Sequence, residues 1–160
     1  MGRRRSAREY ALQVLFQQEF SDLEPVESLR RFWRDKSPDP EVIEYTEWLV
    51  TGVLPHLEAI DKAVQPFSEN WRISRMGVVD RNILRLAVFE MLFEEHIAPA
   101  VIINEALEIT KKFSSDKAAH FINGILDAVG RNIDRLRIEM KDRNNDGTEG
   151  QRSEEGNGPS

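Results

Sequence analysis

The sequence contains no cysteine among its 160 residues, which excludes disulfide bonds and thiolate metal sites. Its three histidines, His56, His96 and His120, are far apart and lack the ligand spacing of a zinc site. No apolar run is long enough to span a membrane, and no apolar signal core follows the basic start. We therefore expect a soluble, cytoplasmic protein without a metal, a cofactor or a membrane partner.

Motifs of catalysis are missing as well. No glycine-rich phosphate loop is present, because the glycines of the helical region stand singly. There is no nucleophile motif. Paired acids such as Glu94 and Glu95 fit solvated helix faces better than a catalytic dyad. The sequence predicts that the protein is not an enzyme.

Strand-like alternation and internal repeats are absent from residues 1–140, and apolar residues recur there at helical spacing instead. This pattern predicts one all-α domain over residues 1–140, with about seven helices. The expected helical segments are 3–20, 25–33, 40–64, 78–95, 99–112 and 116–140.

Three segments carry more detailed expectations. Gly52 and Pro55 lie inside segment 40–64, so we expect either a kink or two helices that meet there. In the connector 67–77 we expect a helical turn with Trp71, Ile73 and Met76 turned inward. Segment 78–95 is apolar on nearly all sides, which predicts a central helix of the core.

The last twenty residues have a different composition. Residues 141–160 contain five acids, three bases and four glycines, and no aliphatic or aromatic side chain. Such a segment buries nothing that offsets the entropy lost on ordering. The sequence predicts a disordered acidic tail over 141–160.

Positive charge is concentrated at the start of an otherwise acidic chain. The formal net charge is -6, yet Arg3, Arg4, Arg5 and Arg8 stand in the first eight residues with no acid among them. Guanidinium groups bind phosphates and stack on unpaired bases. Apolar residues within 7–16 tie this arginine arm to the core through one helix. The arm is then either an RNA-binding element or a frayed, solvated terminus.

Two other stretches allow a functional and a structural interpretation. Asp80, Arg81 and Arg85 interrupt the most hydrophobic helix, where they form either a surface set of charges or part of a protein-docking face. Phe121 follows small residues at 118 and 119 near a helix start. A phenylalanine in that place either packs in the core or provides a stacking platform for a base.

Four motifs stand in order along roughly residues 3–130: RRSAREYALQVLF from Arg4, DRNILRLAVFE from Asp80, PAVIINEALEITK from Pro99 and FINGILD from Phe121. Together they closely resemble the NusB family of bacterial transcription antitermination factors. The resemblance implies two packed three-helix bundles. It also implies joint binding of single-stranded boxA RNA with NusE, the ribosomal small-subunit protein. The expected context is an RNA polymerase antitermination complex that reads through terminators, notably in ribosomal RNA transcription.

The same resemblance suggests which residues meet each partner. RNA contacts are expected from Arg3, Arg4, Arg5, Arg8, Gln13, Lys117 and Phe121, and partner contacts from Phe16, Asp80, Arg85 and Glu90. Some family members carry an acid where Lys117 stands, so the effect of this lysine on RNA affinity is left open.

The sequence leaves other functions and oligomeric states open. NusB-like domains also occur ahead of RNA cytosine methyltransferases, but we expect no catalytic half in this chain. A scaffold that binds only protein is a third alternative. A homodimer that covers the arginine-bearing face is also open.

Overall fold

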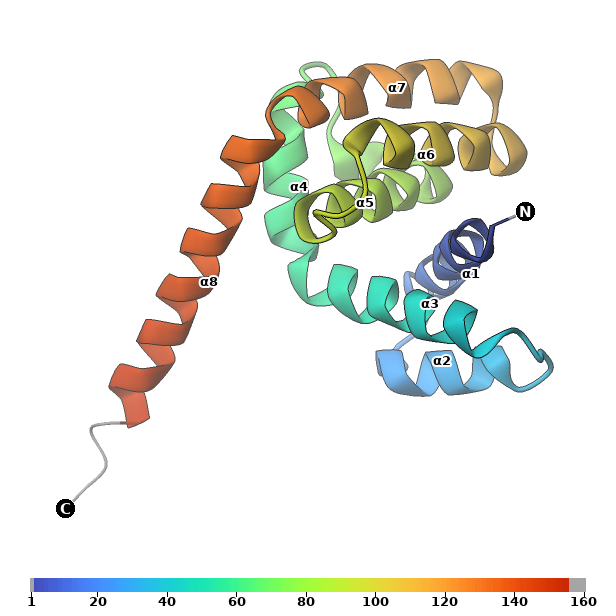
Figure 1. Cartoon of the computed structure of the whole chain (residues 1–160), viewed down its shortest axis with the longest axis horizontal. Coiled ribbons are helices and arrows are strands. Elements are labelled where there is room, and N and C mark those ends of the chain that lie inside the picture. Colours follow the sequence, from blue (N-terminus) through green and yellow to red (C-terminus); the bar gives the residue numbers. More distant parts are fainter. Residues whose placement is uncertain (1, 156–160) are drawn as a thin grey trace.

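The computed structural model describes the backbone of residues 2–155 and the side chains of residues 2–145. Within these limits every regular element is helical (Figure 1), which confirms the all-α class. The α-helices are α1 Arg3–Gln18, α2 Pro25–Trp33, α3 Pro40–Val53, α4 Leu57–Val64, α5 Val78–Phe93, α6 Pro99–Phe113, α7 Asp116–Arg131 and α8 Ile133–Glu155. Short 3₁₀ turns lie at η1 Leu54–His56, η2 Gln65–Phe67 and η3 Ile73–Arg75.

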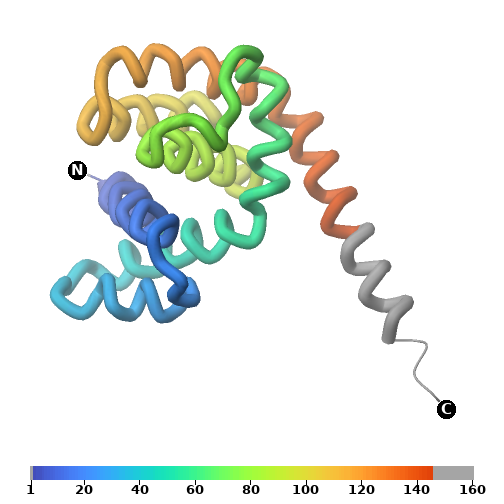
Figure 2. The backbone as a smooth tube through the Cα atoms, turned by 180° about the vertical axis from the view of Figure 1, so that it is seen from behind, coloured from blue at the N-terminus to red at the C-terminus, as the bar shows by residue number. Residues whose placement is uncertain are grey.

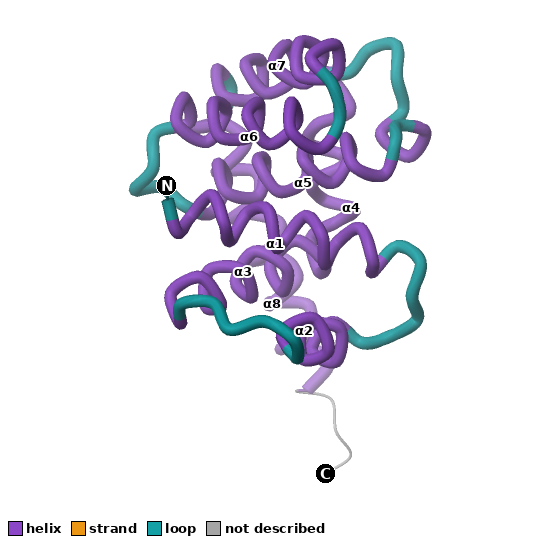
Figure 3. Tube along the Cα trace, turned by 90° about the vertical axis from the view of Figure 1, so that its right-hand side faces the viewer, coloured by secondary structure: helices purple, strands orange, loops and turns teal. Residues whose placement is uncertain are grey.

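The helices form two packed groups that share α5. Helices α1, α2 and α3 contact one another, while α4, α6, α7 and the start of α8 pack around α5. Figure 3 shows α7, α6, α5, α1 and α3 stacked in that succession. Because α1 and α3 also contact α5, that helix is covered from both groups, as its all-round apolar pattern predicts.

The long third segment is two helices rather than one kinked helix. Proline lacks a backbone N–H and cannot continue an α-helix interior. The turn η1, which contains Pro55, accordingly separates α3 from α4. Gly52 is needed for close packing, because a Cβ there would overlap the ring of Phe89 on α5. This contact brings the backbone of α3 directly against the central helix.

The connector between α4 and α5 contains the expected turn, η3, but not every expected side chain turns inward. Ile73 and Met76 are 2% and 9% exposed, whereas Trp71 is 59% exposed. The inward placement of Trp71 was therefore wrong. Residues three apart share one side of a 3₁₀ turn, and Trp71 precedes the turn that aims Ile73 and Met76 at the core.

The segment predicted as one last helix is broken at Asn132. Its backbone leaves helical geometry with φ -110° and ψ 14°, and its side-chain amide donates to the carbonyl of Ala128 at 2.8 Å. The break lets α8 leave the body of the molecule at an angle to α7 (Figure 1). Ile133, Leu136 and Met140 still bury their side chains against the core.

The expected tail over 141–160 lies mostly beyond the residues whose side chains the structure describes. Helix α8 continues through Glu155, so residues 141–155 have helical backbone, and residues 156–160 lie outside the described part of the chain. Extending an existing helix is far less costly than starting one, which accounts for helical backbone in so polar a segment. Residues 141–145 are exposed, in keeping with their polar composition. No helix of the described part has the length and apolarity required to cross a bilayer.

Candidate nucleic-acid interface

One face of helix α1 is buried in the core, and the outer residues of the arginine arm project from the same helix. Ala7, Ala11 and Leu15 face the core with at most 1% exposure, so the helix cannot rotate without losing this packing. The side chains of Arg3 and Arg4 are 60% and 51% exposed. The arm is thus held at a defined place instead of fraying, which argues against the solvated-terminus interpretation.

Arg8 lies one turn deeper than the rest of the arm and is not at the surface. Its Nε and Nη2 donate to the two carboxylate oxygens of Glu90 at 2.6 and 2.8 Å, and the Tyr45 hydroxyl donates to the same carboxylate at 2.8 Å. The side chains of Arg8 and Glu90 are only 7% and 1% exposed. In this structure neither side chain is exposed to RNA or to a partner, so the contacts expected of Arg8 and Glu90 remain predictions that would require this pair to open.

Burial and the charge of Glu90 shift the pKa of Arg8 and of the neighbouring Tyr45. Burial alone would lower the pKa of Arg8, but the hydrogen bonds and charge of Glu90 raise it overall. Burial and the charge of Glu90 raise the pKa of Tyr45. Arg8 is therefore a permanent cation, and Tyr45 remains a hydrogen-bond donor to Glu90 at neutral pH.

The three outer arginines each face an acid. Arg5 donates to Glu105 on α6 through Nε at 2.7 Å and Nη2 at 3.0 Å, a bidentate geometry that equally suits a phosphate. The hydrogen bond from Arg5 holds the pKa of Glu105 below its ordinary value. Arg3 donates to Glu41 at 2.7 Å, and Arg4 lies 3.8 Å from Glu94.

Arg4 separates two open grooves. On one side, a groove of about 500 Å³ is lined by Trp48, Tyr45 and acids of α3, and the Arg4 guanidinium lies 4.2 Å from the centre of the Tyr45 ring. On the other side, a groove of about 470 Å³ runs between the arm and α6, past Val101 and Glu105. Both grooves bring aromatic or aliphatic surface beside the guanidinium groups, which is the chemistry that unpaired bases and phosphates require.

The remaining residues expected to contact RNA do not join the arm. Gln13 is half-buried on α1, and Lys117 and Phe121 are exposed on α7. Among the described residues no hydrogen bond, ion pair or ring contact links these three to the arginines. Phe121 instead contacts Trp71, with ring centroids 6.4 Å apart.

An aromatic pair marks a second surface at the other end of α1. Phe16 and Phe20 are 40% and 71% exposed, and their ring centroids lie 5.3 Å apart. Phe16 was an expected partner contact, whereas Phe20 was expected only as the last residue of the first helical segment, 3–20. Because α1 ends at Gln18, Phe20 lies beyond the helix and leaves the stripe. The turn residues that follow Phe20 were the sequence signal that the helix ends near it.

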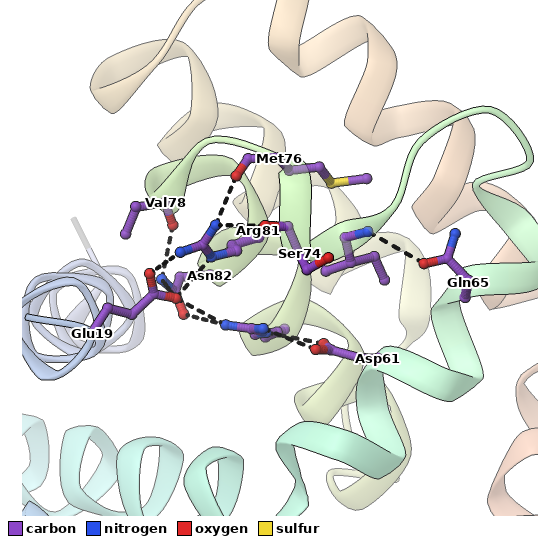
Figure 4. Close-up of polar contacts among 10 residues, drawn as sticks. Glu19, Asp61, Gln65, Ser74, Met76, Val78, Arg81 and Asn82 are labelled. Atoms are coloured by element: carbon purple, nitrogen blue, oxygen red, sulfur yellow. Dashed lines mark hydrogen bonds and ion pairs between the residues drawn. The ribbon is translucent and has the colours of Figure 1, made fainter.

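The charged residues of α5 mostly bond inside the protein (Figure 4). Arg85 donates to Asp61 on α4 at 3.0 and 2.9 Å and to Glu19 at 3.0 Å. Arg81 forms a bidentate pair with Glu19 and donates to the carbonyl of Met76 at 2.9 Å. Arg85 was expected to contact a partner; its side chain is 12% exposed and already bonded to Glu19 and Asp61 in this structure.

This Glu19 cluster, made of Glu19, Asp61, Arg81, Asn82 and Arg85, ties the end of α1 to α4 and α5. Burial alone would raise the pKa of Glu19, but the hydrogen bonds and charge of Arg81, with the amide of Asn82, lower it overall. The cluster fixes the end of α1 next to the Phe16–Phe20 pair.

Asp80 stands in the first turn of α5, half-buried, one residue before Arg81. Its Oδ1 is buried without a hydrogen-bond partner among the described residues. A carboxylate is favourable at a helix N-terminus, but an unpaired buried oxygen costs free energy. Asp80 is thus the one charged residue of this stretch with a carboxylate oxygen left unpaired inside the protein. In the described part of the chain no cluster of histidine, aspartate and glutamate could hold a metal ion.

Comparison with known proteins shows the family of the chain. The model of the NusB family matches residues 5–131. The transcription antitermination protein NusB of Bdellovibrio bacteriovorus is 49% identical over 131 residues, which cover 80% of this chain and 95% of that protein.

Solved structures show the same fold. The T. maritima NusB structure has a TM-score of 0.76 at 35% identity, covering 87% of this chain and 98% of that one. A structure of antitermination factors NusB and NusE in complex with dsRNA has a TM-score of 0.74 at 30% identity, covering 82% and 98%. The chain described here belongs to the NusB family of transcription antitermination proteins.

Proposed function

We propose that this protein binds boxA-type single-stranded RNA together with NusE, as a non-catalytic adaptor in the cytoplasm. In this role it joins an RNA polymerase antitermination complex and helps the enzyme read through terminators, notably in ribosomal RNA transcription. The observation that carries the proposal is the arginine arm, which a buried helix face holds beside two grooves. The complex of NusB, NusE and dsRNA among similar structures supports both partners.

RNA phosphates would replace the carboxylates that now pair with the arginine arm. Arg3, Arg4 and Arg5 already face carboxylates, so a phosphate replaces an existing ion pair. The net electrostatic gain is small for such an exchange, which suits a protein of modest RNA affinity that depends on a partner. Three phosphate contacts on a single strand correspond to a salt slope of about -2.

The second surface is the proposed site for NusE. The Phe16–Phe20 pair supplies exposed aromatic area, and the half-buried Asp80 supplies a negative charge. Aromatic residues at the centre of an interface contribute most of its binding energy. Because the arm and this pair stand at opposite ends of α1, RNA and NusE can occupy the protein together, and each would strengthen binding of the other.

RNA binding should be measured with and without NusE for the wild type and for a variant with Arg3, Arg4 and Arg5 changed to alanine. We expect the variant to lose about tenfold or more in affinity for the single strand at low salt, with a flatter salt dependence. A duplex of the same sequence serves as a competitor. Equal RNA affinity of the two proteins would refute the role of the arm.

The partner surface is tested separately. Asp80→Arg should abolish co-elution with NusE on size exclusion, while the fold measured by circular dichroism is retained. Retained co-elution would move the interface elsewhere. Light scattering across protein concentration tests whether a homodimer instead occupies one of these surfaces.

A further inference from the structure

The groove beside α3 differs in charge from the groove beside α6. The α3 groove is lined by Arg3, Arg4, Glu41, Glu44, Tyr45, Trp48 and Glu94, so that three acids stand against two arginines. Among the described residues that line the α6 groove, three are arginines and one, Glu105, is an acid. Because carboxylates repel phosphates and attract cations, an RNA strand suits the α6 groove and a positively charged ligand suits the α3 groove.

A cation of the protein itself already lies in the α3 groove. The Arg4 guanidinium is 4.2 Å from the centre of the Tyr45 ring and 3.8 Å from Oε2 of Glu94. The other oxygen of Glu94, Oε1, accepts the backbone N–H of His96 at 3.0 Å, which fixes the carboxylate. A guanidinium over an aromatic face is attracted by the ring. One pair of ring and acid in this groove is therefore matched to a guanidinium.

Trp48 and Glu44 form a second pair of the same kind. They stand four residues apart on α3 and so share one side of the helix. Within the part of the chain that the structure describes, Glu44 forms no ion pair and no cation lies over the Trp48 ring. Tryptophan attracts a cation more strongly than tyrosine does. The groove has a volume of about 500 Å³ and is open to solvent, so a second guanidinium fits beside Arg4.

Both aromatic rings are held in place from behind. The Tyr45 hydroxyl donates to the buried Glu90 at 2.8 Å. The Trp48 ring packs on Phe89 with centroids 4.9 Å apart, and the rings of Tyr45 and Trp48 are 5.3 Å apart. Rings that are already fixed lose little entropy when a ligand binds to them, so this surface is pre-organised.

The acids continue along the same side of α3. Glu41, Glu44 and Trp48 stand at positions i, i+3 and i+7, which places them in one row. Glu41 pairs with Arg3 at 2.7 Å, but both side chains are exposed, and such a pair is readily exchanged. A row of this kind fits a chain with several basic side chains better than a single small cation. The formal net charge of -6 adds a general attraction for a basic protein.

We propose that the α3 groove binds an arginine side chain from a basic segment of a partner protein, with the guanidinium on the Trp48 ring and paired with Glu44. The site goes beyond the proposed function and needs no RNA. An RNA strand in the α6 groove would draw Arg4 toward its phosphates, which frees the ring of Tyr45 for another basic side chain of the same segment.

The test uses an acetylated and amidated peptide of alternating arginine and glycine, and a control peptide with neutral citrulline at each arginine. Calorimetry measures the affinity, and the indole N–H signal of Trp48 reports the place of binding. We expect Trp48→Leu to weaken binding of the arginine peptide about tenfold and Glu44→Gln about threefold. Equal affinity of wild type for the two peptides would overturn the proposal.

The matched control is Glu58→Gln, which changes the net charge as Glu44→Gln does. Glu58 is an exposed acid of α4, and Figure 2 shows α4 beside α8, on the side of the molecule away from the N-terminus. This variant should bind the arginine peptide like wild type. Equal losses in Glu44→Gln and Glu58→Gln would reduce the effect to net charge and overturn the proposal.

Trp48 also packs on Phe89, so its replacement by leucine affects the core as well as the groove. Trp48→Phe keeps a ring, identifies the indole signal by its absence and should retain most of the peptide affinity. The exposed change Glu44→Gln leaves the core intact. Wild-type affinity in Glu44→Gln would therefore overturn the proposal whatever the leucine variant does.

Two other occupants of the groove give different results. Glu44→Gln and Trp48→Phe should bind boxA-type RNA at least as well as wild type, so the proposed function stands or fails separately. Loss of RNA affinity with unchanged peptide affinity would assign the groove to RNA and overturn the proposal. A Trp48 signal that shifts with protein concentration alone, together with a rising mass in light scattering, would assign it to a second copy of the chain and overturn the proposal equally.

Discussion

The guanidinium of Arg8 and the carboxylate of Glu90 are buried together between the two helical groups, and Tyr45 completes the hydrogen bonding of that carboxylate. Buried charges are tolerated only when they are paired and hydrogen-bonded, since their desolvation is costly. Arg8 also lies 3.8 Å from Glu105, the partner of Arg5. A buried cation therefore lies directly beneath the exposed arm, and its ion pair fixes the position of α1 along α5.

Glu90→Gln should destabilise the protein strongly, because it removes the charge that is hydrogen-bonded to the buried guanidinium of Arg8 and leaves only Glu105, 3.8 Å away, as a counter-charge. Breaking a buried pair from one side costs about 3–5 kcal/mol of unfolding free energy. Urea denaturation followed by circular dichroism measures this loss. Glu41→Gln is the control, since its partner Arg3 is exposed, and it should unfold close to wild type. Similar midpoints for the two variants would contradict the structural role of Glu90.

The lowered pKa of Glu19 predicts a loss of stability in acid. The folded state holds this carboxyl ionised below its ordinary pKa of 4.5, so its contribution is present above that value. The contribution is lost as the pH falls through the lower pKa of the folded state. Urea denaturation between pH 7 and pH 3 should show this decline, and Glu19→Gln should show less of it. If the stability of Glu19→Gln fell with pH as steeply as that of wild type, the decline would come from other carboxyls.

At the scale of elements, the contact between α3 and α5 sets the distance between the two helical groups. Gly52 allows the ring of Phe89 to lie against the α3 backbone, and the ring of Trp48 packs on Phe89 with centroids 4.9 Å apart. The same pair of helices carries Tyr45 and Glu90. A small shift of α3 would therefore disturb the buried ion pair as well as the aromatic packing.

Gly52→Ala and Gly124→Ala should change stability in opposite directions. Both glycines lie inside helices, where alanine is favoured by up to about 1 kcal/mol. At Gly52 the new methyl group overlaps Phe89, and such overpacking costs about 1–3 kcal/mol. At Gly124 there is open space, so only the helical gain remains. Thermal unfolding of the two variants measures the difference, and stabilisation by Gly52→Ala would show that Phe89 can move aside.

The helical elements were largely predictable from sequence because their apolar spacing and their prolines act locally. The periodic stripe of α1, the all-round pattern of α5 and the break at Pro55 all follow from residues close in the chain. The break at Asn132 could not be predicted in this way. The side chain of Asn132 bonds the backbone of its own helix, and the apolar spacing continues past it without interruption. Trp71 was misplaced because its orientation depends on Gln65 and Ser68, whose bonds form only in the folded loop.

For the whole molecule, the arginine arm is electrostatically masked in the free protein. Asp39 just before α3, Glu41 on α3, Glu94 after α5 and Glu105 from α6 surround it. These acids come from three separate parts of the chain, so the fold assembles a carboxylate environment that a phosphate strand must displace. The concentration of positive charge in the first eight residues thus does not create an equally positive surface.

Replacing the masking acids should raise RNA affinity. A variant with Glu41, Glu94 and Glu105 changed to glutamine should bind the single strand on the order of tenfold more tightly at low salt. The matched control changes Glu58, Asp127 and Glu139 to their amides, which alters net charge equally but unpairs residues away from the arm. Equal gains in RNA affinity in both variants would show that the effect comes from net charge alone.

The candidate site was only partly predictable, for a reason that concerns distance along the chain. The exposure of Arg3, Arg4 and Phe16 follows from their places on α1. The burial of Arg8 depends on Glu90, which is 82 residues away, and no local pattern places the two opposite each other. The available signals were the small residues around Arg8 and the position of Glu90 on the apolar face of α5. The masking acids could not be identified without the fold.

The shared position of α5 has a consequence for how the protein denatures. Both helical groups use this one helix as a wall of their core, so neither group can open without exposing apolar surface that the other group also needs. Unfolding should then be a single cooperative transition, with one calorimetric peak whose van't Hoff enthalpy equals the calorimetric enthalpy. Amide protons of α5 should exchange with solvent last, at the rate of global unfolding.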